Sequence, residues 1–242
     1  MPRKLPFAPR RAAAQATTLV SLLLPACGGG PAVRDDTAER TAFALVQSPP
    51  GQWIPAFEAI LACGTPAAAA LVRAVDANPH SPGAQPAVTA LGCLGDPSAA
   101  ALLLRLLEHQ SPDLAAEAAL SLARLGVQSA RPGLLTTMLD REKTTYVRTA
   151  AAAALLDLGD RDGAVAFACD VLLAPTDRGR DRARALGLPV DQVRWAVERN
   201  LAIDALARAA GGEAFGLDAD ASWPELAASV GRVRAHFQRS GR

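Results

Sequence analysis

Apolar positions along the chain gather in runs about as long as a helix, and each run ends at a glycine. The runs FEAILACG, VTALGCLG, ALSLARLG and AAALLDLG end at Gly64, Gly95, Gly126 and Gly159, so the spacings are 31, 31 and 33 residues. A period of this length is typical of helical solenoids. The apolar residues are mostly Ala, Leu and Val, and only 4% of the chain is aromatic. This composition favours closely packed helices over strands, so we predict an all-α fold.

One unit shows how the pattern defines two helices. Ser111-Pro112-Asp113 has the signals of a helix start, with proline near the first turn and an acid that complements the helix dipole. Leucines and alanines follow until Gly126, where a left-handed residue is expected to end the helix. A second helix is predicted at about residues 130–140. Each unit is therefore expected to be a helix pair.

The segments GDPSAAALLLRLL and GDRDGAVAFACDVL, together with the Val147-Arg148 pair, resemble the HEAT repeat family in its short bacterial form, also found in phycobilin lyase subunits. The resemblance implies a right-handed α-solenoid of about five helix pairs whose second helices line the concave side. It also implies that Arg148 and Arg194 pair with acids of neighbouring repeats. Repeats of this type share a fold without sharing a function.

The resemblance divides the body of the chain into two parts. The solenoid is expected over 51–212, with a charged insertion at 174–190 where the period breaks. Residues 213–242 are expected to form a C-terminal helical cap, because Phe215-Gly216-Leu217-Asp218 is similar to the turn that opens this cap in bacterial envelope HEAT proteins. A cap is needed, since an open solenoid end exposes its apolar face.

The N-terminal segment carries the signals of export. Residues 1–26 have a basic start and a short apolar stretch, which together predict a signal peptide. Leu24-Pro25-Ala26-Cys27 resembles the lipobox of bacterial lipoproteins, which implies lipid attachment at Cys27 and a flexible tether over 27–50. The expected location is the cell envelope, at the outer membrane or facing the periplasm. Secretion without a lipid and a cytoplasmic protein with a misassigned start remain the alternatives.

Charge argues against nucleic acid as a partner. The net charge is +1, but residues 1–26 hold four basic residues and no acid, so the remainder has a net charge of −3. Such a body lacks the basic stripe that phosphate backbones require.

No catalytic or metal motif is found either. The histidines His80, His109 and His236 are far apart and have no second ligand at helical spacing, so solvated or capping roles are expected. No phosphate loop or nucleophile elbow is present. We therefore expect no metal, no cofactor and no enzymatic activity.

Two cysteines lie near the ends of neighbouring first helices. Cys63 and Cys93 could form a bridge between adjacent repeats in an oxidising compartment. Alternatively, each is a small buried residue in an alanine-rich core. Both interpretations stay open on the sequence.

Polar positions on the predicted second helices, together with the charged insertion, form the candidate surface for a partner. The mixed signs on the helices indicate a protein rather than a phosphate or a metal as ligand. Insertions in solenoids often lie on the binding face, which brings in the arginines of the loop. The candidate residues are Arg73, Arg105, Glu108, Asp140 and Asp170 on the helices and Arg178, Arg180, Arg182 and Arg184 in the insertion.

These observations predict a non-enzymatic protein-binding or scaffold module, held at the cell envelope by a lipid. A second interpretation is a lyase-like or chaperone-like accessory subunit that handles a cofactor or an unfinished protein. A third is a structural spacer without a specific partner. The sequence does not identify the partner.

Overall fold

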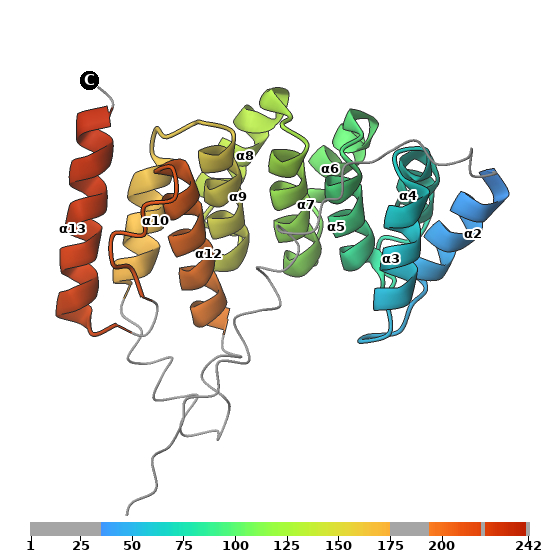
Figure 1. Ribbon diagram of the computed structural model, residues 1–242, viewed down its shortest axis with the longest axis horizontal. Helices are drawn as coiled ribbons and strands as arrows, with labels where there is room; N and C mark the ends of the chain where they lie inside the picture. The colour runs from blue at the N-terminus through green and yellow to red at the C-terminus, as the bar shows by residue number, and fades with distance from the viewer. Residues whose placement is uncertain (1–34, 175–193, 219–220, 241–242) are drawn as a thin grey trace, which may run out of the picture. The chain divides into compact units, whose positions relative to one another are not determined.

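A computed structural model describes residues 35–174, 194–218 and 221–240, which form eleven α-helices, two short 3₁₀-helices and no β-strand (Figure 1). The predicted all-α solenoid is confirmed over these residues, which belong to one compact unit spanning Val33–Arg242. The predicted signal peptide, Cys27 and most of the charged insertion lie outside the described residues.

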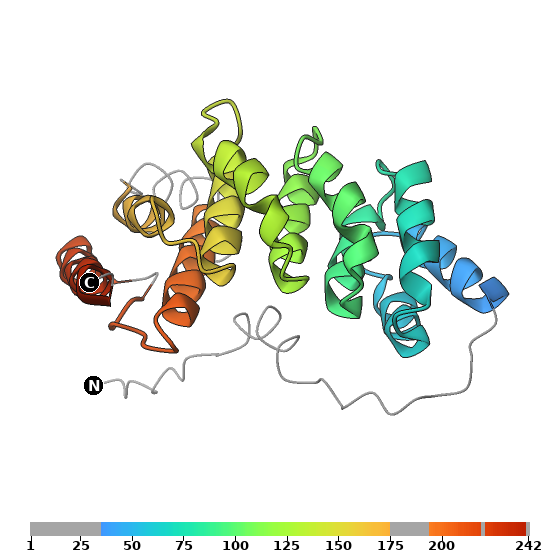
Figure 2. The same ribbon diagram turned by 90° about the horizontal axis from the view of Figure 1, so that it is seen from above.

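The helices form two rows within this unit (Figure 2). The first row holds the first helix of each pair: α3 (Ile54–Cys63), α5 (Ala84–Leu94), α7 (Pro112–Arg124), α9 (Thr145–Asp157) and α12 (Arg194–Ala209). The second row holds α2 (Asp35–Val46), α4 (Ala67–Ala77), α6 (Ala100–Leu106), α8 (Arg131–Leu139), α10 (Ala164–Leu173) and α13 (Trp223–Ser240). The 3₁₀-helices Pro97–Ala99 and Gln128–Ala130 lead into α6 and α8.

The predicted helix ends are confirmed. The Ser111 hydroxyl accepts a hydrogen bond from the Leu114 amide at the start of α7, with an oxygen–nitrogen distance of 3.5 Å, and Thr144 caps α9 in the same way. Gly126 follows the end of α7 with φ of +65°, in the left-handed region that favours glycine. The glycines at the ends of the other runs also have positive φ, as the sequence period predicts.

Alanine allows the first helices to approach one another closely. In α9, every residue of 149–156 is buried, because α7 and α12 cover its flanks and α8 and α10 cover its inner side. Neighbouring second helices from α4 to α10, by contrast, have few close backbone contacts. The resemblance implied that the second helices line the concave side. The packing shows that the first-helix row is the more closely spaced one.

Two first helices approach closely between α5 and α7. Gly92 faces Ser121, whose hydroxyl donates to the Val88 carbonyl over 2.9 Å. A Cβ added at Gly92 would lie 2.7 Å from the Ser121 Oγ, 2.9 Å from its Cβ and 3.0 Å from its Cα. A side chain at this position therefore pushes the two helices apart.

Replacing Gly92 with alanine is expected to lower the free energy of unfolding by about 1–3 kcal/mol, because the backbone of α7 has to shift. Urea unfolding measures this change. The matched control is Gly231→Ala in α13, where an added Cβ meets no atom within 4 Å. Alanine is the better helix former, so the control is expected to be neutral or to stabilise by up to about 1 kcal/mol. Equal effects of the two substitutions would contradict this account of the α5–α7 contact.

The solenoid begins earlier than predicted. Residues 27–50 were expected to form a flexible tether, but α2 packs against α3, α4 and α5. Its side chains Ala38, Ala42 and Leu45 are buried, because α2 covers the apolar face that the first helix pair cannot bury alone. The Gly83 amide donates to the Val46 carbonyl over 3.0 Å and joins the end of α2 to the start of α5.

Cationic side chains bind the free carbonyls at several helix C-termini. Arg148 was expected to pair with an acid, but its Nε donates to the Met138 carbonyl over 2.9 Å, and its guanidinium lies 4.9 Å from the centre of the Phe167 ring. The side chain of Arg194, which was also expected to pair with an acid, lies outside the described residues. Each such contact satisfies a carbonyl that has no partner within its own helix. The other donor–carbonyl pairs are Lys143 with Leu107, Arg131 with Leu158, Arg161 with Ala209 and Arg199 with Leu172.

Replacing Arg148 with methionine, which keeps the length of the side chain, is expected to destabilise the fold by about 1–3 kcal/mol. It leaves the Met138 carbonyl without this donor and removes the charge over Phe167. Thermal and chemical unfolding measure the loss. The control is Arg141→Met in the exposed turn after α8, which is expected to change stability by less than about 0.5 kcal/mol. A loss at position 141 as large as that at 148 would show that general charge, not carbonyl capping, is responsible.

The C-terminal segment continues the second row. Helix α13 packs against α10, with Leu226, Val230 and Val233 buried. The turn before it holds Phe215 at φ of +53°, and the Arg232 guanidinium donates to the Phe215 carbonyl over 2.7 and 3.0 Å. The Phe-Gly turn is thereby fixed to the helix that follows it.

Candidate interaction surface

The charged residues predicted to bind a partner lie along the second-helix row, and most of them pair with a neighbouring helix. Arg73 of α4 contacts Glu39 of α2 at 2.7 Å, and Arg105 of α6 contacts Asp76 of α4 at 2.5 Å. The remaining pairs are Glu108 with Lys143 at 2.8 Å and Asp170 with Arg234 of α13 at 3.1 Å.

These contacts form a ladder of ion pairs across successive helices. Exposed pairs contribute little stability each. In this structure they direct the charged groups toward one another. Asp140 is used differently. Its carboxylate accepts a hydrogen bond from the Glu142 amide over 2.9 Å in the turn after α8. The predicted residues therefore do not converge on one site.

The ladder is interrupted at α8. The positions that hold Arg73 and Arg105 in the two preceding units hold Thr136 here, 31 residues after Arg105. The position of Glu108 is taken by Leu139, again 31 residues later. Leu139 is 60% exposed and Leu135, on the same helix, is 40% exposed. We call Leu135, Thr136 and Leu139 the α8 strip.

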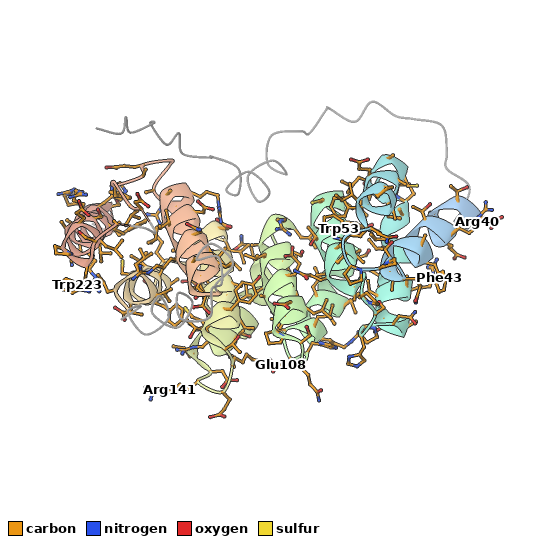
Figure 3. All side chains as sticks on the ribbon, turned by 90° about the horizontal axis from the view of Figure 1, so that it is seen from below. Arg40, Phe43, Trp53, Glu108, Arg141 and Trp223 are labelled. Carbon is orange, nitrogen blue, oxygen red and sulfur yellow. The ribbon has the colours of Figure 1, made fainter. Side chains whose placement is uncertain are left out.

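Charged residues lie near the α8 strip, with Glu108 after the end of α6 and Arg141 in the turn after α8. Figure 3 shows Glu108 and Arg141 projecting from the same side of the unit. On the side of α6, Leu104 and Leu107 would lie 3.8 and 3.7 Å from a Cβ added at Gly133, so α6 and α8 contact each other beneath the strip. The missing charge at positions 136 and 139 could have been found in the sequence by aligning the units.

The other predicted site residues fall into two groups. Cys27 and the arginines Arg178, Arg180, Arg182 and Arg184 lie outside the described residues. Cys63 and Cys93 are free thiols in the structure, as is the buried Cys169. Burial raises the pKa of the Cys93 and Cys169 thiols, with nearby arginines acting in the opposite direction. A raised pKa reduces the thiolate fraction, so these two thiols are poor nucleophiles.

Two histidines from successive inter-repeat loops meet, which the sequence did not predict. The ring centres of His80 and His109 lie 4.8 Å apart. The Nδ1 atom of His109 accepts a hydrogen bond from the Ser111 amide over 3.1 Å, so this nitrogen carries no proton. Burial lowers the pKa of His109, and the neighbouring His80 lowers it further. The neutral form of His109 is therefore part of the turn that starts α7.

Among the described residues, no three His, Cys, Asp or Glu side chains gather in a way that could hold a metal ion. Within the same ranges, no helix combines the length and the apolar character that crossing a membrane requires.

Comparison with known proteins supports the repeat assignment. Residues 68–156, which include α5 to α8 and most of α4 and α9, match the family model of HEAT repeats. No curated protein matches this chain, and no solved structure matches it. HEAT repeats generally mediate protein–protein interaction, so the likeness favours a protein as the ligand without identifying it.

The histidine contact gives a pH prediction. Because the folded protein binds a proton at His109 less readily than the unfolded chain, stability is fully present above the ordinary histidine pKa of about 6.5 and is lost as the pH falls through the lowered folded value. His109→Asn keeps an acceptor for the Ser111 amide but does not titrate. Urea unfolding is measured at about pH 7.5 and about pH 5.5, on either side of the ordinary histidine pKa. The free energy of unfolding should fall less at the acid pH in the variant than in the parent. An unchanged loss would assign the acid sensitivity to other groups.

Proposed function

We propose that this protein is a non-enzymatic HEAT-repeat scaffold that binds another protein through the α8 strip. The observation that carries the proposal is the contrast along one row of helices. The charges of α4, α6 and α10 are paired with neighbouring helices, while α8 exposes Leu135 and Leu139. Aliphatic side chains surrounded by a polar rim are typical of the centre of a protein interface.

The spacing of the helices supports the same interpretation. The backbones of neighbouring second helices from α4 to α10 lie farther apart than those of the first helices, so this row presents a broad face to a partner. The surface also extends over several units, as is usual for solenoid binding faces. Recognition through α8 would therefore be extended and protein-like.

We further propose that the protein acts in the cell envelope, held there by a lipid on Cys27. The support for this part comes from the sequence, namely the signal-like residues 1–26 and the Leu-Pro-Ala-Cys motif. Acyl chains hold a protein at a membrane in proportion to the methylenes they bury. Confinement to a surface raises the effective concentration of a partner without any new contact.

Crosslinking in the native host, followed by capture and mass spectrometry, tests both parts. A Leu139→Glu variant places a charge in the α8 strip and is expected to lose the captured protein, with a loss in affinity of about tenfold or more. Ala69→Glu is the matched control, because it adds the same charge at an exposed position of α4 on the same row. It should keep the partner.

A Cys27→Ala variant separates the anchor from the binding face. It should keep affinity for the partner in solution and lose both its membrane fraction and the crosslinks formed in cells. No specific capture with the parent chain would refute the scaffold. Capture that persists in Leu139→Glu would place the binding face elsewhere.

A further inference from the structure

The two ends of the helix stack carry surfaces that are complementary to each other. At the N-terminal end, α2 packs on α3, α4 and α5 with one side only, and its other side holds Asp36, Arg40 and Phe43. Phe43 is 58% exposed, which is unusual for a ring of this size. Figure 3 shows Arg40 and Phe43 pointing away from the stack at this end and Trp223 exposed at the opposite end.

The C-terminal end holds an open hollow. It has a volume of about 410 Å³ and lies between the Phe-Gly turn and the first half of α13. Ala221, Ala228 and Gly216 provide its small and apolar lining, and Asp218, Glu225 and Arg232 add charge. The side chain of Ala228 is exposed, so the hollow can be entered from solvent.

Charge favours contact between these two ends. The outer side of α2 holds one acid and one base, Asp36 and Arg40, and the lining of the hollow likewise holds both signs, with Asp218 and Glu225 beside Arg232. Arg40 lies one helical turn from Phe43 on α2, and the carboxylates that line the hollow belong to Asp218 and Glu225. An aromatic anchor beside a cation at one end is thus matched by a small apolar hollow with acids in its wall at the other end.

We propose that copies of this chain associate head to tail, with Phe43 of one copy entering the hollow at the C-terminal end of the next. Glu225 remains available for this contact. One of its oxygens accepts hydrogen bonds from the Ser222 amide and hydroxyl at the start of α13, over 2.9 and 2.6 Å, and the other oxygen can face Arg40. The contact joins two different surfaces, so each added copy still has one free end and the assembly grows into chains.

The experiment compares two variants that each remove one end. The full chain carries Cys27→Ala throughout, so that no acylated cysteine drives association. Phe43→Ser removes the anchor, and Ala228→Arg fills the hollow with a long charged side chain. Both positions are exposed, so the variants should unfold at the same temperature as the parent.

Sedimentation equilibrium over a range of concentrations is the measurement. The parent should form dimers and longer species, and its association should weaken as salt rises because charge contributes. Each variant alone should stay monomeric, with an association constant lower by about tenfold or more. An equimolar mixture of the two variants should form dimers and nothing longer, because only one pair of complementary ends remains.

Three results would overturn the proposal: a parent that stays monomeric at every concentration, a Phe43→Ser variant that assembles as the parent does, and a mixture that remains monomeric. Leu139→Ser serves as a control, since it removes another exposed apolar side chain from the α8 strip. It should assemble like the parent. Loss of assembly in this control would show that copies meet through the α8 strip instead.

Discussion

Every helix pair in this chain is too thin to enclose its own apolar residues, and the rest of the structure depends on that constraint. Leu71, Leu91, Leu103, Leu122 and Leu134 are completely buried, yet they come from three successive pairs that share one continuous core. Burial of this kind requires neighbours at a fixed and short distance. Alanine on the first helices and Gly92 at the α5–α7 contact provide that distance. Helix α2 is part of the fold for the same reason, because the first pair needs a cover.

Stacking helices in this way leaves many helix ends in contact with neighbouring units, and the carbonyls at those ends need partners. Arginine and lysine side chains from the next element provide them, as Arg148 does for Met138 and Lys143 for Leu107. These contacts are local in space but distant in sequence. They hold successive units in register, whereas the ion pairs on the second-helix row lie at the surface and contribute less.

The glycine period and the alanine-rich runs predict the helices, their order and the stacked architecture, because periodicity and helix ends are local properties. The partners of individual charges could not be predicted. Arg148 binds a carbonyl and an aromatic ring, and Arg73 pairs with Glu39 in a segment expected to be a tether. Such contacts depend on how one helix is rotated against the next, which composition does not encode. The α8 strip falls between these cases. Its leucines are visible in the sequence, but their exposure becomes clear only once α8 is placed in the row.

The unequal spacing of the two rows has a mechanical consequence. The first helices form a dense edge in which alanine packs against alanine, and in α9 every residue of 149–156 is buried by this packing. Between α4 and α10 the opposite edge has few close backbone contacts, and its helices meet through side chains. We therefore expect the protein to be stiffer along the first-helix row than along the second-helix row. Bending is expected to change the side-chain contacts between second helices more than the close backbone contacts between first helices.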